Sequence, residues 1–245
     1  IKLLETIEKI TSTVSVSTSH ELKNGDLVTL EVNPNLSVGI GTSTAVRVKY
    51  NQNYGYLLIN QTNFTSTAIN TSTNEITINS HGLKTGDKVF YESSDTVAPG
   101  LTVGPYFVYK INNNLINLCQ TYFDTQLIKP NVVNITGVGG NGHKLSLINP
   151  QIPSVRNSNL IFDLSDSTLT EYDFKLFYDK DFYNEFVSTG DGVSFNIVGT
   201  ATSLAINYSN NLPSKLYYTL SKNGNIIPPD TDVENNSEII FINSS

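Results

Sequence analysis

A ten-residue motif occurs twice in this chain, and it constrains the architecture more than any other feature. Ser19–Val28 reads SHELKNGDLV and Ser80–Val89 reads SHGLKTGDKV, so both copies fit S-H-x-L-K-x-G-D-x-V with their histidines 61 residues apart. The same offset relates four later pairs: Lys49 and Lys110, Asn51 and Asn112, Asn53 and Asn114, and Leu57 and Leu118. A shared offset at both ends of a segment indicates a tandem duplication.

The composition predicts an all-β fold. Only 15% of the residues are charged, against roughly 25% in ordinary globular proteins. Asn, Ser and Thr take their place, and these residues favour turns and strand surfaces over helix interiors. Ile1–Ile10 is the only stretch with helical spacing of its apolar residues, and it could equally be the end of a preceding element. A chain without methionine that starts at Ile1 is expected to be a piece of a longer protein.

Charge and cysteine content argue against several classes of protein. The net charge of −7 argues against a nucleic-acid-binding surface, which needs clustered Lys and Arg. No apolar run approaches the roughly 18 residues of a membrane span. The single Cys119 excludes an internal disulfide framework, and its setting in Leu118–Gln120 favours a buried strand residue. We expect no nucleic-acid partner, no membrane insertion, no cofactor and no metal.

Alternating apolar residues and turn signals divide the chain into four parts. Residues 1–10 are expected to be a linker or the end of a preceding element, 11–68 to form small β-barrel module A, 69–150 its duplicate, module B, and 151–245 module C. The expected strands of modules A and B are Val14–Ser17, Leu27–Val32, Ala45–Lys49, Tyr56–Ile59, Glu75–Asn79, Lys88–Glu92, Tyr106–Ile111, Leu115–Cys119, Val132–Ile135 and Lys144–Ile148. Residues 60–74 are expected to be a connector.

Module C has a different sequence pattern and is predicted to be an immunoglobulin-like β-sandwich. Its strands are expected at Leu160–Leu164, Phe174–Tyr178, Val193–Val198, Ser203–Tyr208, Lys215–Leu220, Asn225–Ile227 and Glu238–Ile242. Asn223-Gly224 between two of them is a strong signal for a type I′ hairpin turn. Seven or so short strands in about 95 residues suit a sandwich of this size.

Two sets of segments resemble tailed-phage structural proteins. His81-Gly82-Leu83, Gly86-Asp87 and Gly104–Val108 resemble a small barrel repeat that is widespread in those proteins and related in pattern to a β-barrel insert of ubiquitin-activating enzymes. Phe162–Asp166, Phe174–Phe177 and Leu212–Tyr218 are similar to segments of very long structural proteins of marine cyanophages. Module A departs from the pattern, with Glu21 in place of the glycine after its histidine. The resemblance implies a virion tail component and brings no catalytic residues.

The repeated His and Gly-Asp are the sharpest candidate site. Two histidines in separate modules do not make a zinc site, which needs three or four converging ligands. We therefore interpret the His, Gly and Asp of both copies as a structural turn motif, in which the imidazole hydrogen-bonds the backbone of the turn. These residues are His20, Gly25, Asp26, His81, Gly86 and Asp87. His143 is given the same structural interpretation.

Two acidic stretches deserve comparison with calcium loops. Asp179–Glu185 has alternating oxygen ligands but lacks the glycine at the sixth position and an acidic residue at the twelfth, where Gly190 stands. Asp230–Glu234 is similar. We interpret both as surface turns.

The sequence favours a non-enzymatic structural component of a phage virion, in the tail, baseplate or tail fibre. Its partners would be other virion proteins, with a homo-oligomer or large assembly, and its location the virion, assembled in the host cytoplasm. Receptor or glycan recognition is the first alternative, because five tyrosines could stack on a ligand although most should be buried: Tyr50, Tyr54, Tyr56, Tyr106 and Tyr109. A polysaccharide-degrading tail enzyme is the second, since two facing carboxylates suffice for that chemistry.

Overall fold

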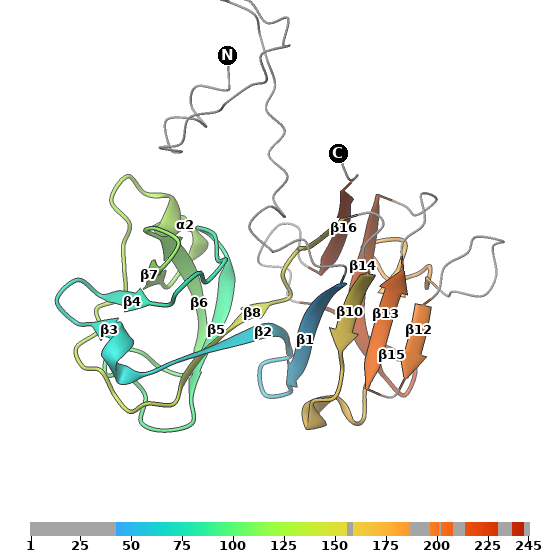
Figure 1. Cartoon of the computed structure of the whole chain (residues 1–245), viewed down its shortest axis with the longest axis horizontal. Helices are drawn as coiled ribbons and strands as arrows, with labels where there is room; N and C mark the ends of the chain where they lie inside the picture. Colours follow the sequence, from blue (N-terminus) through green and yellow to red (C-terminus); the bar gives the residue numbers. More distant parts are fainter. Residues whose placement is uncertain are drawn as a thin grey trace, which may run out of the picture.

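The computed structural model describes residues 43–155, 159–186, 197–200, 202–207, 214–229 and 237–242, and these residues form an all-β protein (Figure 1). They contain one α-helix, α2 (Tyr122–Gln126), and two 3-10 turns, η2 (Ser66–Ala68) and η3 (Ser167–Leu169). The predicted strands before residue 43, the Ile1–Ile10 stretch and the first copy of the repeated motif lie outside this part of the chain.

One strand path runs through most of the molecule, in the order β12-β13-β10-β1-β2-β8-β5-β6-β7-β4-β3. A second sheet has the order β11-β14-β16-β9, with β15 paired to β14. The strands are β1 (Ser43–Asn51), β2 (Tyr56–Phe64), β3 (Ile69–Asn70), β4 (Glu75–Thr77), β5 (Lys88–Ser93), β6 (Gly104–Lys110), β7 (Leu115–Cys119), β8 (His143–Ile148), β9 (Ile152–Val155), β10 (Asn159–Asp163), β11 (Asp173–Phe177), β12 (Ile197–Thr200), β13 (Ser203–Asn207), β14 (Lys215–Lys222), β15 (Asn225–Ile227) and β16 (Glu238–Ile242).

The first lobe, which we call the curled lobe, is the part of this path from β2 to β3. Its strands wrap around a core that contains Ile76, Val89, Tyr91, Val108 and Leu118. The two edge strands of the curl, β2 and β3, are joined through η2, but no strand pairing closes the ring within the described residues. The described residues therefore form no closed barrel, and the predicted nearly closed small barrel stays a prediction.

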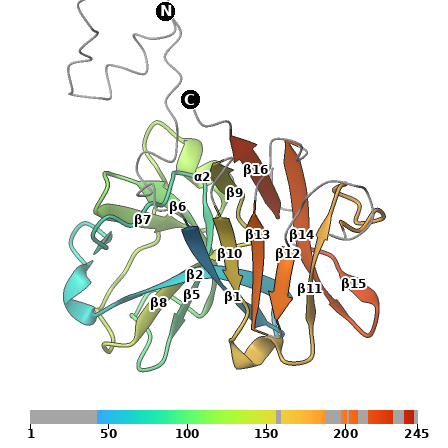
Figure 2. The same ribbon diagram turned by 45° about the vertical axis from the view of Figure 1, so that its right-hand side comes forward.

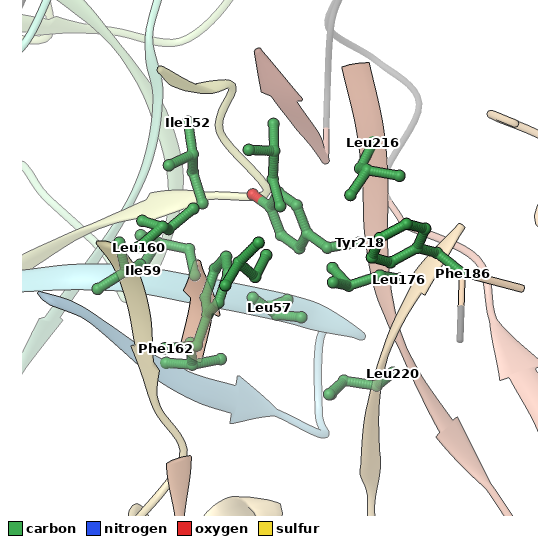
Figure 3. Close-up of a cluster of buried hydrophobic side chains, with 14 of the residues drawn as sticks. Leu57, Ile59, Ile152, Leu160, Phe162, Leu176, Phe186, Leu216, Tyr218 and Leu220 are labelled. Carbon is green, nitrogen blue, oxygen red and sulfur yellow. The ribbon is translucent and has the colours of Figure 1, made fainter. Parts of the chain in front are cut away.

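The second lobe is a sandwich, in which the β12-β13-β10-β1 part of the long path faces the β11-β14-β16-β9 sheet (Figures 1 and 2). Its core holds large side chains from both sheets, and Figure 3 shows Leu160 and Phe162 of β10 lying close to Tyr218 of β14. Two of its pairings are parallel, β1 with β10 and β9 with β16. We call this part the sandwich lobe.

The β1–β2 hairpin belongs to both lobes. Alternation on β1 sends Val46, Val48 and Tyr50 into the sandwich core, and Leu57 and Ile59 of β2 join them. The far end of β2 then enters the curled lobe, where its last residue, Phe64, is part of the core. Residues 46–59, assigned to module A by the sequence prediction, thus supply side chains to the core of the C-terminal lobe.

A bulge lets β2 serve both lobes. The pairing of β2 with β8 shifts register between Ile59 and Thr62, and Asn60 between them has φ +51°. The Oδ1 of Asn60 accepts a hydrogen bond from the backbone N–H of Arg47 at 3.0 Å. A bulge bends a strand and increases its local twist, so the strand can leave one lobe and continue into the other.

The two halves of the predicted repeat share a turn at the offset of 61 residues. The Asn51 side chain accepts from the N–H of Asn53 at 3.1 Å, and the Asn112 side chain accepts from the N–H of Asn114 at 2.8 Å. The hairpins differ in register, because Asn51 pairs with Tyr56 whereas Lys110 pairs with Ile116. The local turn chemistry is thus common to both halves, while the strand pairing is not.

Three local expectations are wrong. The predicted connector at residues 60–74 contains the end of β2, η2 and β3. Residues 132–135 make a single bridge, from Val132 to Cys119, and are no strand. Ile1–Ile10 is not the only helical stretch, because α2 forms behind a capping box in which Thr121 and Asp124 bond each other's backbone N–H groups. Among the described residues no helix is long and apolar enough to cross a membrane.

Candidate interaction surfaces

The second copy of the repeated motif forms the loop between β4 and β5, and two backbone groups hold its His81. Nδ1 accepts the N–H of Leu83 at 2.9 Å, and Nε2 lies 2.9 Å from the carbonyl oxygen of Asn112. Because Nδ1 accepts, the proton is on Nε2, which donates to Asn112. Burial lowers the pKa of His81, which favours this neutral form. The imidazole ties the loop to the β6–β7 hairpin.

The Gly-Asp step of the motif closes the same loop. The Oδ2 of Asp87 accepts the N–H of Lys84 at 2.7 Å, and the N–H of Asp87 donates to the carbonyl of Lys84 at 3.2 Å. Gly86 has φ +93°, a conformation that favours glycine. Burial raises the pKa of Asp87. The motif residues of module A, His20, Gly25 and Asp26, lie outside the described part of the chain.

The loop supports a cluster of exposed apolar side chains around α2. A Cβ added to Gly86 would lie 2.7 Å from Cε2 of Tyr122, so only glycine lets this ring approach the turn. The ring also meets Phe107 edge-on, with centroids 6.2 Å apart. Around it, Phe123 is 70% exposed and Ile128 fully exposed. We name the α2 patch for its four large exposed apolar side chains: Tyr122, Phe123, Leu127 and Ile128.

The α2 patch is held in place by polar contacts at its base. The carboxylate of Asp124 accepts from the N–H and hydroxyl of Thr121 and from the side-chain amide of Asn131. The first of these contacts helps to cap α2, a helix of five residues. The apolar side chains are therefore presented by an ordered turn. Such exposed patches on soluble proteins mark interaction sites more often than isolated apolar residues do.

His143 lies at the start of β8 and is fully buried in the curled lobe. Its Nδ1 lies 2.8 Å from the hydroxyl of Tyr91, and its Nε2 lies 2.9 Å from the carbonyl oxygen of Val138. The Tyr91 oxygen in turn accepts the N–H of Ala98 at 3.0 Å. The carbonyl of Val138 requires a donor, so Nε2–H donates to it and the Tyr91 hydroxyl donates to Nδ1. Every polar atom of this network has a partner.

Cys119 and the first acidic stretch both have local structural explanations. Cys119 is fully buried at the end of β7, and burial raises the pKa of its thiol to about 11, so it is protonated at neutral pH. The carboxylate of Asp179 accepts the backbone N–H groups of Tyr183 and Asn184 and so closes the turn. Glu185 pairs with Lys175 at 2.8 Å. Asp230–Glu234 lies outside the described residues.

No three His, Cys, Asp or Glu side chains come together as metal ligands in the part of the chain that the structure describes. The tyrosines considered for ligand stacking differ in their exposure. Tyr50 and Tyr106 are buried, whereas Tyr54 is 44% exposed and stacks on Tyr56 at 5.8 Å. The Tyr54 hydroxyl donates to the carbonyl of Val103 at 3.0 Å, which fixes the ring.

Sequence reasoning missed the exposed apolar side chains of the α2 patch. Phe123 and Ile128 belong to no sequence motif. Only the high proportion of large apolar residues in Tyr122–Ile128 could have indicated an exposed apolar surface there. Comparison with known proteins finds no matching family model, no similar curated protein and no similar solved structure. The function is therefore argued from the chain itself.

Proposed function

We propose that this chain is a non-enzymatic structural component of a tailed-phage virion, in the tail, baseplate or tail fibre. The observation that carries the proposal is the α2 patch. A surface turn that presents Phe123 and Ile128 to solvent suits a chain whose working state is an assembly, where a neighbouring subunit covers them. Its partners would be other virion proteins or further copies of itself, with assembly in the host cytoplasm.

The sequence resemblance supplies the virion part of the proposal, and strand order supports its finer architecture. In the sandwich lobe, the orders β12-β13-β10 and β11-β14-β16-β9 suit an immunoglobulin-like arrangement in which the first strand pairs in parallel with the last. The curled lobe suits an opened-out small barrel. The repeated motif would then mark the entry turn of each of two duplicated modules.

Locating the chain in the particle tests the proposal. Purified virions are labelled with an antibody against residues 151–245 and imaged by electron microscopy. We expect label on the tail or baseplate. Label confined to the capsid, or no label on any particle, contradicts the proposal.

A further inference from the structure

The strands β9 and β16 form a parallel pair at the boundary between the two lobes. β8 of the curled lobe ends at Ile148, and only residues 149–151 separate it from β9. β16 is the last strand of the described chain, and it pairs with β9 in a register that places Ile239 opposite Ile152 (Figure 2). The start of β9 and the end of β16 therefore lie at opposite ends of one short ladder.

Tension applied to these two ends acts along the strands. Because the strands are parallel, pulling the start of β9 away from the end of β16 makes one strand slide past the other, and the hydrogen bonds between them are loaded together. Pulling the two strand starts apart loads the bonds one after another instead. A strand pair that must break all its bonds at once unfolds more slowly under force, and the rate of unfolding governs the force that a fold withstands.

Both strands are fixed in the sandwich core, so neither slides freely. Ile152 of β9 and Ile239 and Phe241 of β16 are buried members of this core. The N–H of Phe241 also donates to the carbonyl of Ser214 at 3.0 Å, on the side where β16 pairs with β14. Sliding of β16 thus breaks bonds on two sides and moves buried side chains through a packed core.

The residues that lead into β9 are held as well. The N–H of Asn149 donates to the carbonyl of Leu57 at 3.0 Å, and the carbonyl of Asn149 accepts the N–H of Ser237 at 2.7 Å. The Tyr218 hydroxyl donates to the carbonyl of Pro150 at 2.5 Å. These bonds connect the link between the lobes to β2, to β14 and to the residue before β16. Tension from the curled lobe therefore reaches β9 through an ordered link.

The proline in β9 stands where it does not weaken the ladder. Phe241 directs its N–H to the β14 side, so by alternation Ile240 and Ile242 direct theirs to β9. Ser154, which lies opposite Phe241, then directs its own N–H and carbonyl to β16. Pro153 has no N–H, and its backbone faces away from β16, as is usual for proline in an edge strand.

We propose that β9 and β16 form a mechanical clamp. The clamp makes the sandwich lobe resist tension between the start of β9 and the end of β16 better than tension that separates the two strand starts. The parallel register, the burial of both strands and the position of Pro153 all contribute to this dependence on direction. Such a clamp suits a chain that links parts of an assembly. It is a property of the isolated chain, so it does not depend on the proposed virion role.

The test is forced unfolding of the purified full chain in an optical trap, with DNA handles on pairs of cysteines. Gln151→Cys with Ser245→Cys pulls along the strands, whereas Gln151→Cys with Asn236→Cys pulls the two strand starts apart. Cys119 is fully buried and takes no handle. We expect the force that unfolds the sandwich lobe to be at least about twofold higher along the strands. Equal forces, or a higher force for the second pair, overturn the proposal.

Variants in the first pulling direction then assign the resistance to the ladder. Ser154→Pro removes an N–H that faces β16 and should lower the unfolding force. Ser154→Ala keeps this N–H and is the matched control, which should unfold at nearly the force of the unsubstituted chain. Thermal unfolding shows whether each variant is folded. Unchanged force in Ser154→Pro, or equal weakening by Ser154→Ala, contradicts the assignment. If Ser154→Pro does not fold, the comparison of the two pulling directions decides the proposal.

Discussion

The ring of Tyr122 rests directly on Gly86, so closely that a Cβ at Gly86 would lie 2.7 Å from the ring. Gly86 belongs to the turn of the repeated motif, and Tyr122 is the first residue of α2, which carries the α2 patch. The motif therefore has a physical task beyond shaping its own loop. It forms the support on which an exposed aromatic residue is positioned.

Gly86→Ala should destabilise the chain more than Gly82→Ala does. Both glycines have positive φ, +93° and +68°, so either substitution adds backbone strain of about 1 kcal/mol. Only at Gly86 does the new methyl group also collide with Tyr122, since nothing lies within 4 Å of a Cβ at Gly82. Urea unfolding should show an extra loss of about 1–2 kcal/mol for Gly86→Ala. Equal losses would contradict the contact.

The His81 bonds should matter more at neutral than at acidic pH. The pKa of His81 is lowered by burial in the folded state, so the unfolded chain takes up the proton first as the pH falls below about 6.5. The stability that the neutral imidazole contributes is full above that pH and is lost as the pH falls towards the folded pKa. His81→Ala should cost about 1–2 kcal/mol at pH 7.5.

The cost of His81→Ala should shrink at pH 5, because the unfolded chain has by then taken up the proton that the folded state resists in order to keep Nδ1 as the acceptor of the Leu83 N–H. Comparing the substitution's effect at the two pH values removes contributions from other titrating groups, such as Asp87. The measurement is urea unfolding of both proteins at pH 7.5 and pH 5. A cost that stays constant or grows at pH 5 would show that the imidazole does not act as an acceptor.

Tyr91→Phe should be among the more damaging conservative substitutions in the curled lobe. It removes a hydroxyl that bonds both His143 and the N–H of Ala98, and it leaves two buried polar groups without partners. Each orphaned group costs about 1–3 kcal/mol. Tyr106→Phe is the control, because its hydroxyl bonds Thr102 in a partly buried setting and should cost less. Chemical denaturation of the two variants measures the difference, and similar losses would contradict this assignment.

Replacing Phe123 and Ile128 of the α2 patch should impair association and leave folding intact. Phe123→Ser with Ile128→Ser changes only exposed atoms, so the free energy of unfolding should move by about 0.5 kcal/mol or less for each change. Analytical ultracentrifugation over a concentration series should show weaker self-association than the wild type. Val103→Ser, at an exposed apolar residue outside the patch, is the control. Unchanged association in the double variant would exclude the patch as a contact between copies.

The sequence predicted which stretches become strands better than it predicted their partners. Leu115–Cys119 and Glu238–Ile242 form strands at the predicted residues, and both residues of the Asn223-Gly224 turn have positive φ. Alternation reports which side chains share a face, and it carries no information on the neighbouring strand. For that reason the parallel pairing of β1 with β10, and the entry of Val46 and Val48 into the sandwich core, could not be foreseen.

The candidate surfaces depend even more on tertiary structure. The pairing of β1 with β10 brings Arg47 opposite Asp163, more than a hundred residues later, and no spacing rule connects them. The short helix α2 depends on the pair Thr121 and Asp124, a weak signal without a following apolar run. Asn60 in β2 has a positive φ, which sequence patterns assign to turns. For that reason the second half of β2, residues 60–64, was predicted to be part of a connector.

If the chain functions within an assembly, a neighbouring subunit covers the α2 patch. Hydrogen–deuterium exchange, followed by mass spectrometry, compares the isolated chain with the same chain in purified virions. We expect slower exchange at residues 122–128 in the particle. Exchange at these residues that is equally fast in both states, or absence of the chain's peptides from purified particles, would contradict it.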